Sequence, residues 1–319
     1  MEITLKTKHH LTMVICSLLL VSCAHTKISQ IPSEAGKRFY YSETDFLNYE
    51  VVGRGEIPVL FFHGLGGSLR NWDDVISYLP KDTFTAYLVD LKGFGLSSKP
   101  RDSHYSIKDN VELVCRFIIA NGLKNFVLVG HSLGGGIALC ITLESLANPQ
   151  LKPRNLVLID AAAYKTDPPF FIKFVRIPVL GKLLLSLLSA EFKATFTLKK
   201  IIYDRKKITP KLIERYTAFM DQDGYNYALM QSSEDLISHH YQQCTQNYRY
   251  ILYPVLVVWG KEDSAIPLSF GAQLIQDLPN AKIQVIERCG HNPHEEFPKE
   301  VADLIISFIM PKEEYIMRY

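Results

Sequence analysis

The sequence is poor in cysteine, has little net charge and contains no apolar run long enough to cross a bilayer. Its 35 Lys and Arg residues nearly balance its 33 Asp and Glu residues, and the formal net charge of +2 gives no reason to expect a nucleic-acid partner. The six cysteines form no C-x-x-C pair and show no metal-ligand spacing. What remains is an ordinary globular composition, 47% apolar and 21% charged, in a 319-residue chain that can bury a large core.

The amino terminus carries a basic start followed by an apolar run. Lys6 and Lys8 precede residues 11–21, a run shorter than the roughly 20 apolar residues that a membrane-spanning helix needs. This pattern is typical of the hydrophobic region of an export signal. The run ends in L-V-S-C at residues 20–23, which resembles the lipobox of bacterial lipoproteins.

The lipobox resemblance implies a lipid-anchored protein of the bacterial cell envelope. Residues 1–22 would be a signal peptide, Cys23 would be lipidated, and the polar residues 23–37 would tether the domain to the membrane. Ala24 stands where inner-membrane lipoproteins of this kind carry Asp, so the resemblance favours the outer membrane. An ordinary cleaved signal and an uncleaved anchor are the alternatives.

Four cysteines follow Cys23, at positions 115, 140, 244 and 289. Cys115 and Cys140 lie in apolar helical segments, which favours buried free thiols. An exported protein could also hold a disulfide, and the sequence does not choose a pairing.

Continuous apolar runs recur along the chain and predict buried strands. After an opening hairpin at residues 38–41 and 46–52, these runs occupy residues 58–62, 85–89, 125–129, 156–159, 254–258 and 282–286. Helical segments separate them; one has apolar residues at helical spacing over 107–118 and a stop at Asn121-Gly122. Strands that alternate with helices predict an α/β fold, in which a mostly parallel sheet has helices on both faces.

The alternation stops over residues 164–250, where no buried-strand run occurs. The segment is amphipathic with a helical pattern, so we expect a helical cap or lid inserted between two core segments, 38–163 and 251–319. Its first part, residues 164–211, is both basic and apolar. Two interpretations stay open: the apolar face packs on the core beneath solvated lysines, or the cap contacts membrane lipid or an acyl chain.

The motif G-H-S-L-G at residues 130–134 is the most informative stretch of the chain. It lies where the apolar run 125–129 meets a Gly-rich helical start at residues 135–139. That context is the one a G-x-S-x-G nucleophile elbow needs, because a tight strand-to-helix turn projects the serine hydroxyl out of the backbone. The sequence therefore predicts Ser132 as a nucleophile.

A serine hydroxyl is a poor nucleophile near neutral pH and needs a base, which in turn needs an orienting acid. In an open parallel sheet these groups are expected on loops at the carboxyl ends of strands. Two such loops follow the last two apolar runs, V-W-G-K-E-D at residues 258–263 and C-G-H-N-P-H at residues 289–294. They offer Asp263 as the acid and His291 as the base.

Four motifs, in addition to G-H-S-L-G, resemble the α/β-hydrolase superfamily, in its capped esterase, lipase and C–C hydrolase branch. They are H-G-L-G-G at residues 63–67, D-L-K-G-F-G-L-S at 90–97, W-G-K-E-D at 259–263 and G-H-N-P-H-E-E at 290–296. The order Ser, Asp, His along the chain also matches this superfamily. The resemblance covers roughly residues 40–312 and implies the α/β-hydrolase fold.

Carried over by position, the resemblance implies a role for each site residue. Ser132 would be the nucleophile, His291 the general base and then acid, and Asp263 the orienting carboxylate. The backbone N–H groups of Leu65 and Leu133 would form the oxyanion hole. The hydrolase loops account for the glycines, so we expect no cofactor and no metal.

Other titratable residues offer alternative roles. Asp160 ends another apolar run and, with Glu262, is an alternative acid. We expect His63 to brace the oxyanion loop, which is the H-G-L-G-G motif at residues 63–67. We expect His131 to pack beneath the elbow and His294 to pack or cap a helix. The adjacent pair His239-His240 lacks the helical spacing of metal ligands.

The function we expect is hydrolysis of a carboxylic ester with an apolar acyl or aromatic group. The serine at the elbow argues against epoxide or halide chemistry, because relatives with those activities carry a carboxylate there. One alternative keeps the triad and cleaves a C–C bond in a vinylogous diketone. The other is a surface lipoprotein that keeps the fold as a binding module without turnover.

Overall fold

The computed structural model describes residues 36–165, 187–235 and 247–310, all within the compact unit Pro32–Tyr319. The predicted signal peptide, Cys23, most of the predicted tether, Cys244 and the His239-His240 pair lie outside the described residues. Within the described ranges, no helix combines the length and apolar character needed to span a membrane.

The core is one eight-stranded sheet with the order β1-β2-β4-β3-β5-β6-β7-β8. β1 and β2, and β2 and β4, pair antiparallel, and every other neighbouring pair is parallel. The strands are β1 (Lys37–Tyr40), β2 (Phe46–Gly53), β3 (Ile57–Phe62), β4 (Phe84–Val89), β5 (Phe126–His131), β6 (Pro153–Ile159), β7 (Val255–Gly260) and β8 (Ala281–Ile286). The predicted α/β architecture is therefore confirmed.

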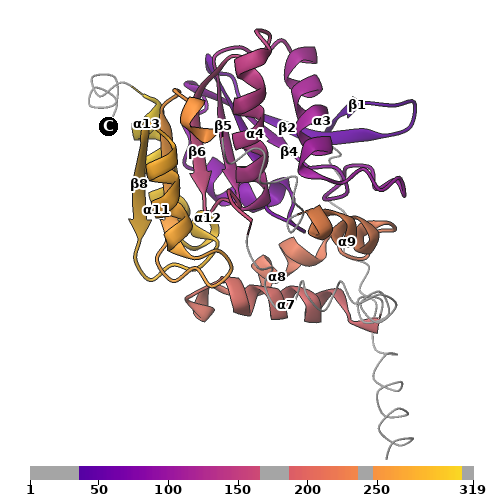
Figure 1. Cartoon of the computed structure of the whole chain (residues 1–319). Helices are drawn as coiled ribbons and strands as arrows, with labels where there is room; N and C mark the ends of the chain where they lie inside the picture. The colour runs from indigo at the N-terminus through magenta and orange to yellow at the C-terminus, as the bar shows by residue number, and fades with distance from the viewer. Residues whose placement is uncertain (1–35, 166–186, 236–246, 311–319) are drawn as a thin grey trace, which may run out of the picture. The chain divides into compact units, whose positions relative to one another are not determined.

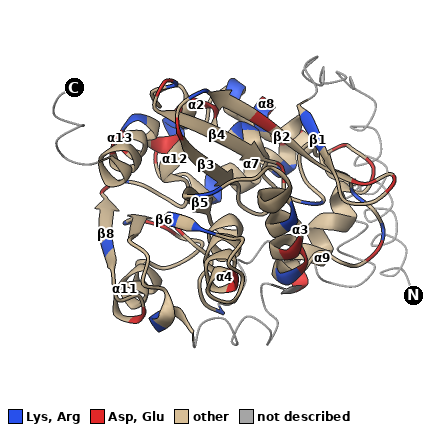
Figure 2. Ribbon diagram, turned by 90° about the horizontal axis from the view of Figure 1, so that it is seen from above, with Lys and Arg blue, Asp and Glu red and all other residues tan. Residues whose placement is uncertain are grey.

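Helices cover both faces of the sheet, as Figure 2 shows from above. One face carries α3 (Ile107–Ala120), α4 (Leu133–Ala147) and α11 (Leu268–Asp277). The other carries η2 (Leu69–Trp72), α2 (Asp73–Ile76), α12 (Pro293–Glu296) and α13 (Pro298–Ile309). Lys and Arg are interspersed with Asp and Glu over the same ribbons, without a stripe of one sign (Figure 2).

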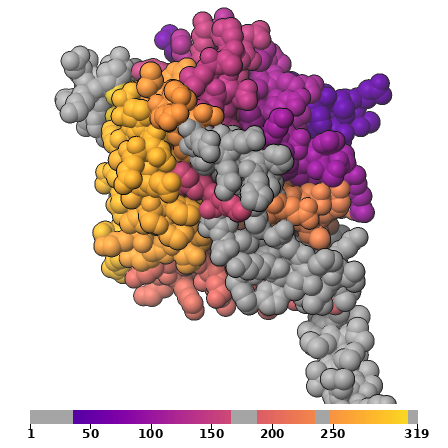
Figure 3. All heavy atoms as spheres, viewed as in Figure 1, coloured from indigo at the N-terminus to yellow at the C-terminus, as the bar shows by residue number. Residues whose placement is uncertain are grey.

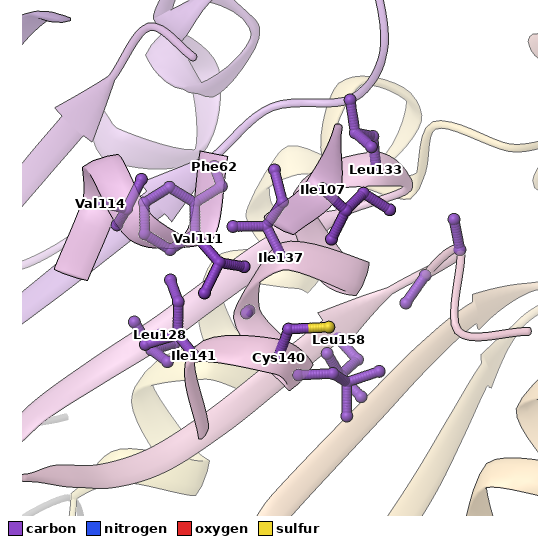
Figure 4. Close-up of a cluster of buried hydrophobic side chains, with 14 of the residues drawn as sticks. Phe62, Ile107, Val111, Val114, Leu128, Leu133, Ile137, Cys140, Ile141 and Leu158 are labelled. Atoms are coloured by element: carbon purple, nitrogen blue, oxygen red, sulfur yellow. The ribbon is translucent and has the colours of Figure 1, made fainter. Parts of the chain in front are cut away.

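Alternate residues of each central strand pack on opposite faces, which explains why the strands are apolar throughout. In β3, Leu60 and Phe62 join the cluster under α3 and α4, whereas Val59 and Phe61 join the cluster under α2 and α13. Figure 4 shows Phe62 and Leu128 in the first cluster, against side chains of α3 and α4 such as Ile137. A strand buried on both faces needs apolar residues at every position.

Helix α3 begins and ends where its sequence signals predict. The Ser106 hydroxyl accepts a hydrogen bond from the Asp109 N–H at 3.1 Å, and the Asp109 carboxylate accepts one from the Ser106 N–H at 2.9 Å. This reciprocal pair satisfies two free N–H groups of the first turn. The helix ends before Gly122, whose φ of +62° is the left-handed conformation that favours glycine.

The described part of the insertion 164–250 is helical and contains no strand. Its elements are α7 (Ala190–Ile201), η3 (Arg205–Lys207), α8 (Pro210–Thr217), α9 (Tyr225–Asp235) and η4 (Tyr248–Tyr250). Figure 1 shows α7, α8 and α9 gathered at one end of the sheet. Tyr248 packs in the main core cluster and donates a hydrogen bond of 2.8 Å to the Ala163 carbonyl, so η4 closes the insertion against the core.

Helix α7 divides its apolar residues between the protein interior and solvent. Leu198 and Ile201 pack with Leu212 of α8 in a small separate cluster. Phe192 and Phe196 point outward, with 53% and 39% of their surface exposed, and their rings stack at 6.2 Å. In the described residues, helix α7 therefore has apolar side chains both in the interior and on the surface.

The order of the strands brings two important loops together. The chain runs from β3 outward to β4 and then returns to β5 on the other side of β3. The loops that follow β3 and β5 therefore begin side by side and diverge. Such a switch point, at the carboxyl ends of parallel strands, is the usual site of ligand binding in open α/β sheets.

Candidate active site

Ser132 lies in a strained turn between β5 and α4. Its φ of +51° and ψ of −118° are values that residues with a side chain rarely adopt. Two hydrogen bonds hold this turn: the Ser132 N–H donates to the Ile159 carbonyl at 3.0 Å, and its carbonyl accepts from the Ala162 N–H at 2.9 Å. Ser132 is half-exposed although His131 and Leu133 on either side are buried.

Gly134 lets α4 approach β3 closely behind this turn. A Cβ at this position would lie 2.3 Å from the Phe62 carbonyl oxygen, a distance that backbone atoms do not tolerate. The helix can therefore begin directly after Ser132 only with glycine at residue 134.

His291 and Asp263 form a direct hydrogen-bonded pair. The His291 Nδ1 lies 2.7 Å from the Asp263 Oδ2, and the two side chains are 8% and 0% exposed. The other carboxylate oxygen, Oδ1, accepts hydrogen bonds from the N–H groups of Ala265 and Ile266 at 2.7 and 3.0 Å. An ionised carboxylate only accepts, so Nδ1 is the protonated ring nitrogen and Nε2 is left as an acceptor.

The backbone of His291 is held from two sides. Its N–H donates to the Ile201 carbonyl, at the end of α7, at 2.7 Å. Its carbonyl accepts a 2.8 Å hydrogen bond from the Nε2 of His131, the residue before Ser132. No hydrogen bond joins the Ser132 hydroxyl to the His291 ring in the described part of the chain. Such bonds are often long without substrate and tighten in the complex.

The loop after β3 packs directly on the serine. A Cβ at Gly64 would lie 3.2 Å from the Ser132 Cβ, so this loop touches the turn at Ser132. His63 braces the loop: its Nε2 accepts from the Leu91 N–H at 3.0 Å and its Nδ1–H donates to the Gly64 carbonyl at 2.8 Å. Burial lowers the pKa of His63 and keeps the ring neutral.

The two predicted oxyanion donors start from neighbouring elements. Leu133 is the first residue of α4, where backbone N–H groups lack partners within the helix. Leu65 lies in the loop that touches Ser132 and is half-buried. Among the described residues, no protein group accepts a hydrogen bond from either N–H, so both donors are available to a ligand.

Cap helix α9 lies over the oxyanion loop. The Tyr225 hydroxyl donates a 3.0 Å hydrogen bond to the Gly66 carbonyl. Leu229, one turn further on, has its Cδ1 3.6 Å from where a Gly66 Cβ would stand. Figure 3 shows the orange surface of α9 against the purple surface of the core. The cap therefore contributes an aromatic and an aliphatic side chain beside Leu65.

The two alternative acids have other partners. The Glu262 carboxylate accepts a 2.9 Å hydrogen bond from the Cys289 N–H, which ties the acid loop to the histidine loop. Asp160 is fully buried, and its Oδ1 accepts from the Gly260 N–H at 2.9 Å. Asp263 is the acid that contacts His291, although Asp160 lies close behind it.

Asp160, Asp263 and His291 also have the chemistry of a metal-ligand set. One ligand atom from each lies within 4.8 Å of the other two. The His291 Nδ1 is already bonded to Asp263, and both oxygens of Asp263 accept hydrogen bonds within the protein. This arrangement fits a hydrogen-bonded chain of side chains better than a coordination shell.

Three histidine rings and a tryptophan ring pack in series behind the site. His131 lies between His291 and His294, with ring centroids 4.9 and 4.3 Å away, and His294 lies 4.6 Å from Trp72. Burial lowers the pKa of His131 well below its usual value and that of His294 to about 3. Both rings are therefore neutral near pH 7 and serve as packing rather than as proton acceptors.

Two acidic residues that tie the cap to the histidine loop were not predicted as functional. The Glu296 carboxylate accepts hydrogen bonds from the N–H groups of Gly290 and Tyr203, at 2.7 and 3.1 Å. Glu295 accepts one from the Tyr216 hydroxyl of α8 at 2.7 Å. Both glutamates directly follow His294 in the sequence, but their cap partners, Tyr216 and Tyr203, lie 79 and 93 residues away, where no local pattern could indicate them.

The family model for the alpha/beta hydrolase fold matches residues 57–298. This chain belongs to the α/β-hydrolase fold family. The matched region of this α/β-hydrolase runs from the first residue of β3 to the start of α13. It contains the turn at Ser132, the loops that carry Asp263 and His291, and the inserted helices.

The α/β-hydrolase is similar to hydrolases that are named for different substrates. It is 28% identical over 276 residues to the uncharacterized hydrolase YugF of Bacillus subtilis, covering 86% of this chain and 95% of that protein. It is 26% identical over 280 residues to 2-hydroxy-6-oxononadienedioate/2-hydroxy-6-oxononatrienedioate hydrolase 1 of Dechloromonas aromatica, covering 82% and 90%. The structure of an esterase from Exiguobacterium antarcticum superposes with a TM-score of 0.71 at 18% identity, covering 86% of this chain and 99% of that one. At this identity the similarity is one of fold.

Proposed function

We propose that this α/β-hydrolase is a serine hydrolase that cleaves carboxylic esters. Ser132 attacks the ester carbonyl carbon while the His291 Nε2 takes the hydroxyl proton. The N–H groups of Leu65 and Leu133 stabilise the negative oxygen of the tetrahedral intermediate. His291 then returns the proton to the leaving alcohol, and the C–O bond breaks to leave an acyl-serine. Water, deprotonated by His291, releases the acid and restores Ser132.

One observation carries this proposal. Ser132 has a positive φ and directly precedes helix α4 at the switch point. The ring of the preceding residue, His131, donates a hydrogen bond to the backbone carbonyl of His291, the proposed proton acceptor. The 2.7 Å bond from His291 to a fully buried carboxylate then fixes the tautomer that leaves Nε2 free to act as a base. Burial lowers the pKa of the neighbouring His63, His131 and His294 rings, which favours their neutral forms and packing roles, so His291 is the residue suited to proton transfer.

The proposed substrate has an apolar acyl or aromatic group next to the reacting carbon. Support comes from the side chains that approach the oxyanion loop, which are Leu65 itself and Tyr225 and Leu229 from α9. Apolar walls with a few convergent polar groups are typical of small-molecule sites.

Cleavage of a C–C bond in a vinylogous diketone is the second candidate. It is favoured by the 26% identity to the Dechloromonas hydrolase of 2-hydroxy-6-oxo dienoates, which extends over most of both chains. Assays of the purified full-length protein in detergent with p-nitrophenyl esters of two to sixteen carbons, beside a 2-hydroxy-6-oxo dienoate, separate the two. Ester turnover that is lost in Ser132→Ala supports the first proposal; turnover of the dienoate alone overturns it.

We also propose that the protein is anchored in the bacterial envelope, with the outer membrane favoured, through a lipid on Cys23. The support is sequence pattern alone, a basic start, an apolar run and L-V-S-C at residues 20–23. An anchored enzyme would meet apolar esters at the membrane surface, where such substrates partition.

A further inference from the structure

Asp160 is a fully buried carboxyl group whose surroundings do not suit a negative charge. It follows β6 with a φ of +41°, which L-residues rarely adopt, and none of its surface is exposed. Its Oδ1 accepts one backbone hydrogen bond, from Gly260. As an ionised acceptor its Oδ2 has no donor in the described part of the molecule. A buried charge with one hydrogen bond is costly.

The missing partner is a second carboxylate. One oxygen of Asp160 lies within 4.8 Å of an oxygen of Asp263 and of a ring nitrogen of His291, so the two carboxyl groups lie close together in a buried site. Two buried carboxylate anions this close repel each other, which favours a proton on one of them, and that proton can then be donated to the other carboxylate. The question is which oxygen holds it.

The donors around each group assign the proton to Asp160. Asp263 already accepts three hydrogen bonds, from the His291 ring and from two backbone N–H groups, and each favours its ionised form. Asp160 accepts one. Of the groups that act on Asp160, Asp263 and Glu296 are both acidic, and the cation Lys207 acts on the neighbouring Cys289 thiol. Burial and the charge of Asp263 both raise the pKa of Asp160 well above its usual value.

We propose that Asp160 is a neutral carboxylic acid whose Oδ2–H donates to the Asp263 carboxylate and thereby positions the Asp263–His291 pair. It is a positioning residue, because it contacts Asp263 and no substrate. The Asp263 carboxylate then accepts one hydrogen bond from the Asp160 Oδ2–H and another from the His291 Nδ1–H. This inference rests on the proposed function, since it assigns a role to the surroundings of that triad.

Two substitutions separate a neutral donor from an ionised acid. Asp160→Asn keeps both features of the neutral acid, an N–H group facing Asp263 and a carbonyl oxygen for the Gly260 N–H. Asp160→Ala removes both and leaves a cavity. Asp263→Asn is the matched control, because it makes the same chemical change in the carboxylate that must stay ionised.

The first readout is stability against pH and needs no catalysis. Above about pH 4 the unfolded chain ionises this aspartate while the folded protein keeps it protonated. Raising the pH therefore favours unfolding of the wild type, and Asp160→Asn lacks this effect. The ratio of the wild-type to the Asp160→Asn unfolding constant, from urea titrations at pH 4.5, 5.5 and 6.5, is expected to rise about tenfold per pH unit. A ratio that is independent of pH overturns the proposal.

The second readout is kcat/KM as a function of pH. Asp160→Asn is expected to stay within about tenfold of the wild type with a similar profile, whereas Asp160→Ala loses more and Asp263→Asn loses most. If Asp160→Asn is as damaging as Asp263→Asn, Asp160 acts as an ionised acid and the proposal is wrong. The ratio of unfolding constants could rise tenfold per pH unit although the wild type hydrolyses neither esters nor the dienoate. That result would support the neutral acid and overturn the proposed function instead.

Discussion

His131 donates a hydrogen bond of 2.8 Å from its Nε2 to the main-chain oxygen of His291. The residue beside the proposed nucleophile thus holds the backbone of the proposed base. On its other side the His291 backbone is held by Ile201, at the end of cap helix α7. The position of His291 therefore depends both on the turn at Ser132 and on the inserted helices.

Loss of charge on Asp263 is expected to abolish most turnover. In Asp263→Asn the amide cannot accept the Nδ1–H in the same way, so His291 adopts the wrong tautomer and kcat falls by roughly 10⁴-fold. Glu262→Gln is the matched control: its amide oxygen still accepts from the Cys289 N–H, and the fall is expected to stay below about tenfold. Steady-state ester hydrolysis measures both. A nearly silent Asp263→Asn would contradict the assignment of the acid.

The buried histidines are expected to make the protein sensitive to acid. The pKa of His294 is about 3 in the folded protein and about 6.5 in the unfolded chain. Between these values the unfolded chain binds more protons, so stability that is complete above pH 6.5 is lost as the pH falls, by about 1.4 kcal/mol per pH unit. His131, with a pKa lowered in the same direction, adds to the effect.

Urea unfolding of wild type and His294→Gln at pH 5.5, 6.5 and 7.5 checks this prediction. The variant is expected to be less stable than the wild type at pH 7.5 and to lose less stability on acidification. An equal loss in both proteins would mean that His294 is not held neutral by burial.

The contact between Tyr216 and Glu295 is expected to fasten the cap. Tyr216→Phe removes the hydroxyl that donates to the buried Glu295 carboxylate at 2.7 Å and accepts from Asn292 at 2.8 Å. A buried carboxylate that loses a donor costs about 1–3 kcal/mol. The exposed Tyr203 gives a matched control, and Tyr203→Phe is expected to change stability by less than about 0.5 kcal/mol. Urea midpoints compare the variants, and equal midpoints would contradict the role of this contact.

The fold was predictable because its signals are local. An apolar run at residues 125–129 followed by a Gly-rich start marks a buried strand and helix, and the structure has β5 at Phe126–His131 and α4 at Leu133–Ala147. The acid and histidine loops were predictable for the same reason, since each directly follows a strand. At these points a short stretch of sequence is enough to predict where the strand ends and the turn begins.

The contacts that arrange the site were not predictable. Asp160 could be recognised as a candidate acid, but nothing near it in the sequence indicates that it lies behind Asp263, about 100 residues away. Glu295 and Glu296 likewise accept hydrogen bonds from Tyr216 and Tyr203 of the cap, where no sequence motif marks the contacting residues. Such contacts depend on how distant segments pack, and no local pattern encodes them.

If the protein is anchored through Cys23, its presence in the membrane fraction depends on the thiol of that residue. Cys23→Ser, expressed as the full chain in a bacterial host, is expected to leave the membrane fraction because lipidation needs the thiol. Cys115→Ser is the matched control and is expected to remain membrane-bound. Fractionation and immunoblotting measure both proteins. Unchanged partition of Cys23→Ser would contradict the lipobox interpretation.

The most direct test of the central claim is covalent labelling with a fluorophosphonate probe. We expect the purified full-length wild type to be labelled at one site and Ser132→Ala to remain unlabelled. Ser264→Ala, which removes an exposed hydroxyl near the acid loop, serves as the matched control and should label normally. Undiminished labelling of Ser132→Ala, or a folded wild type that does not react, would contradict the assignment of Ser132 as an activated nucleophile.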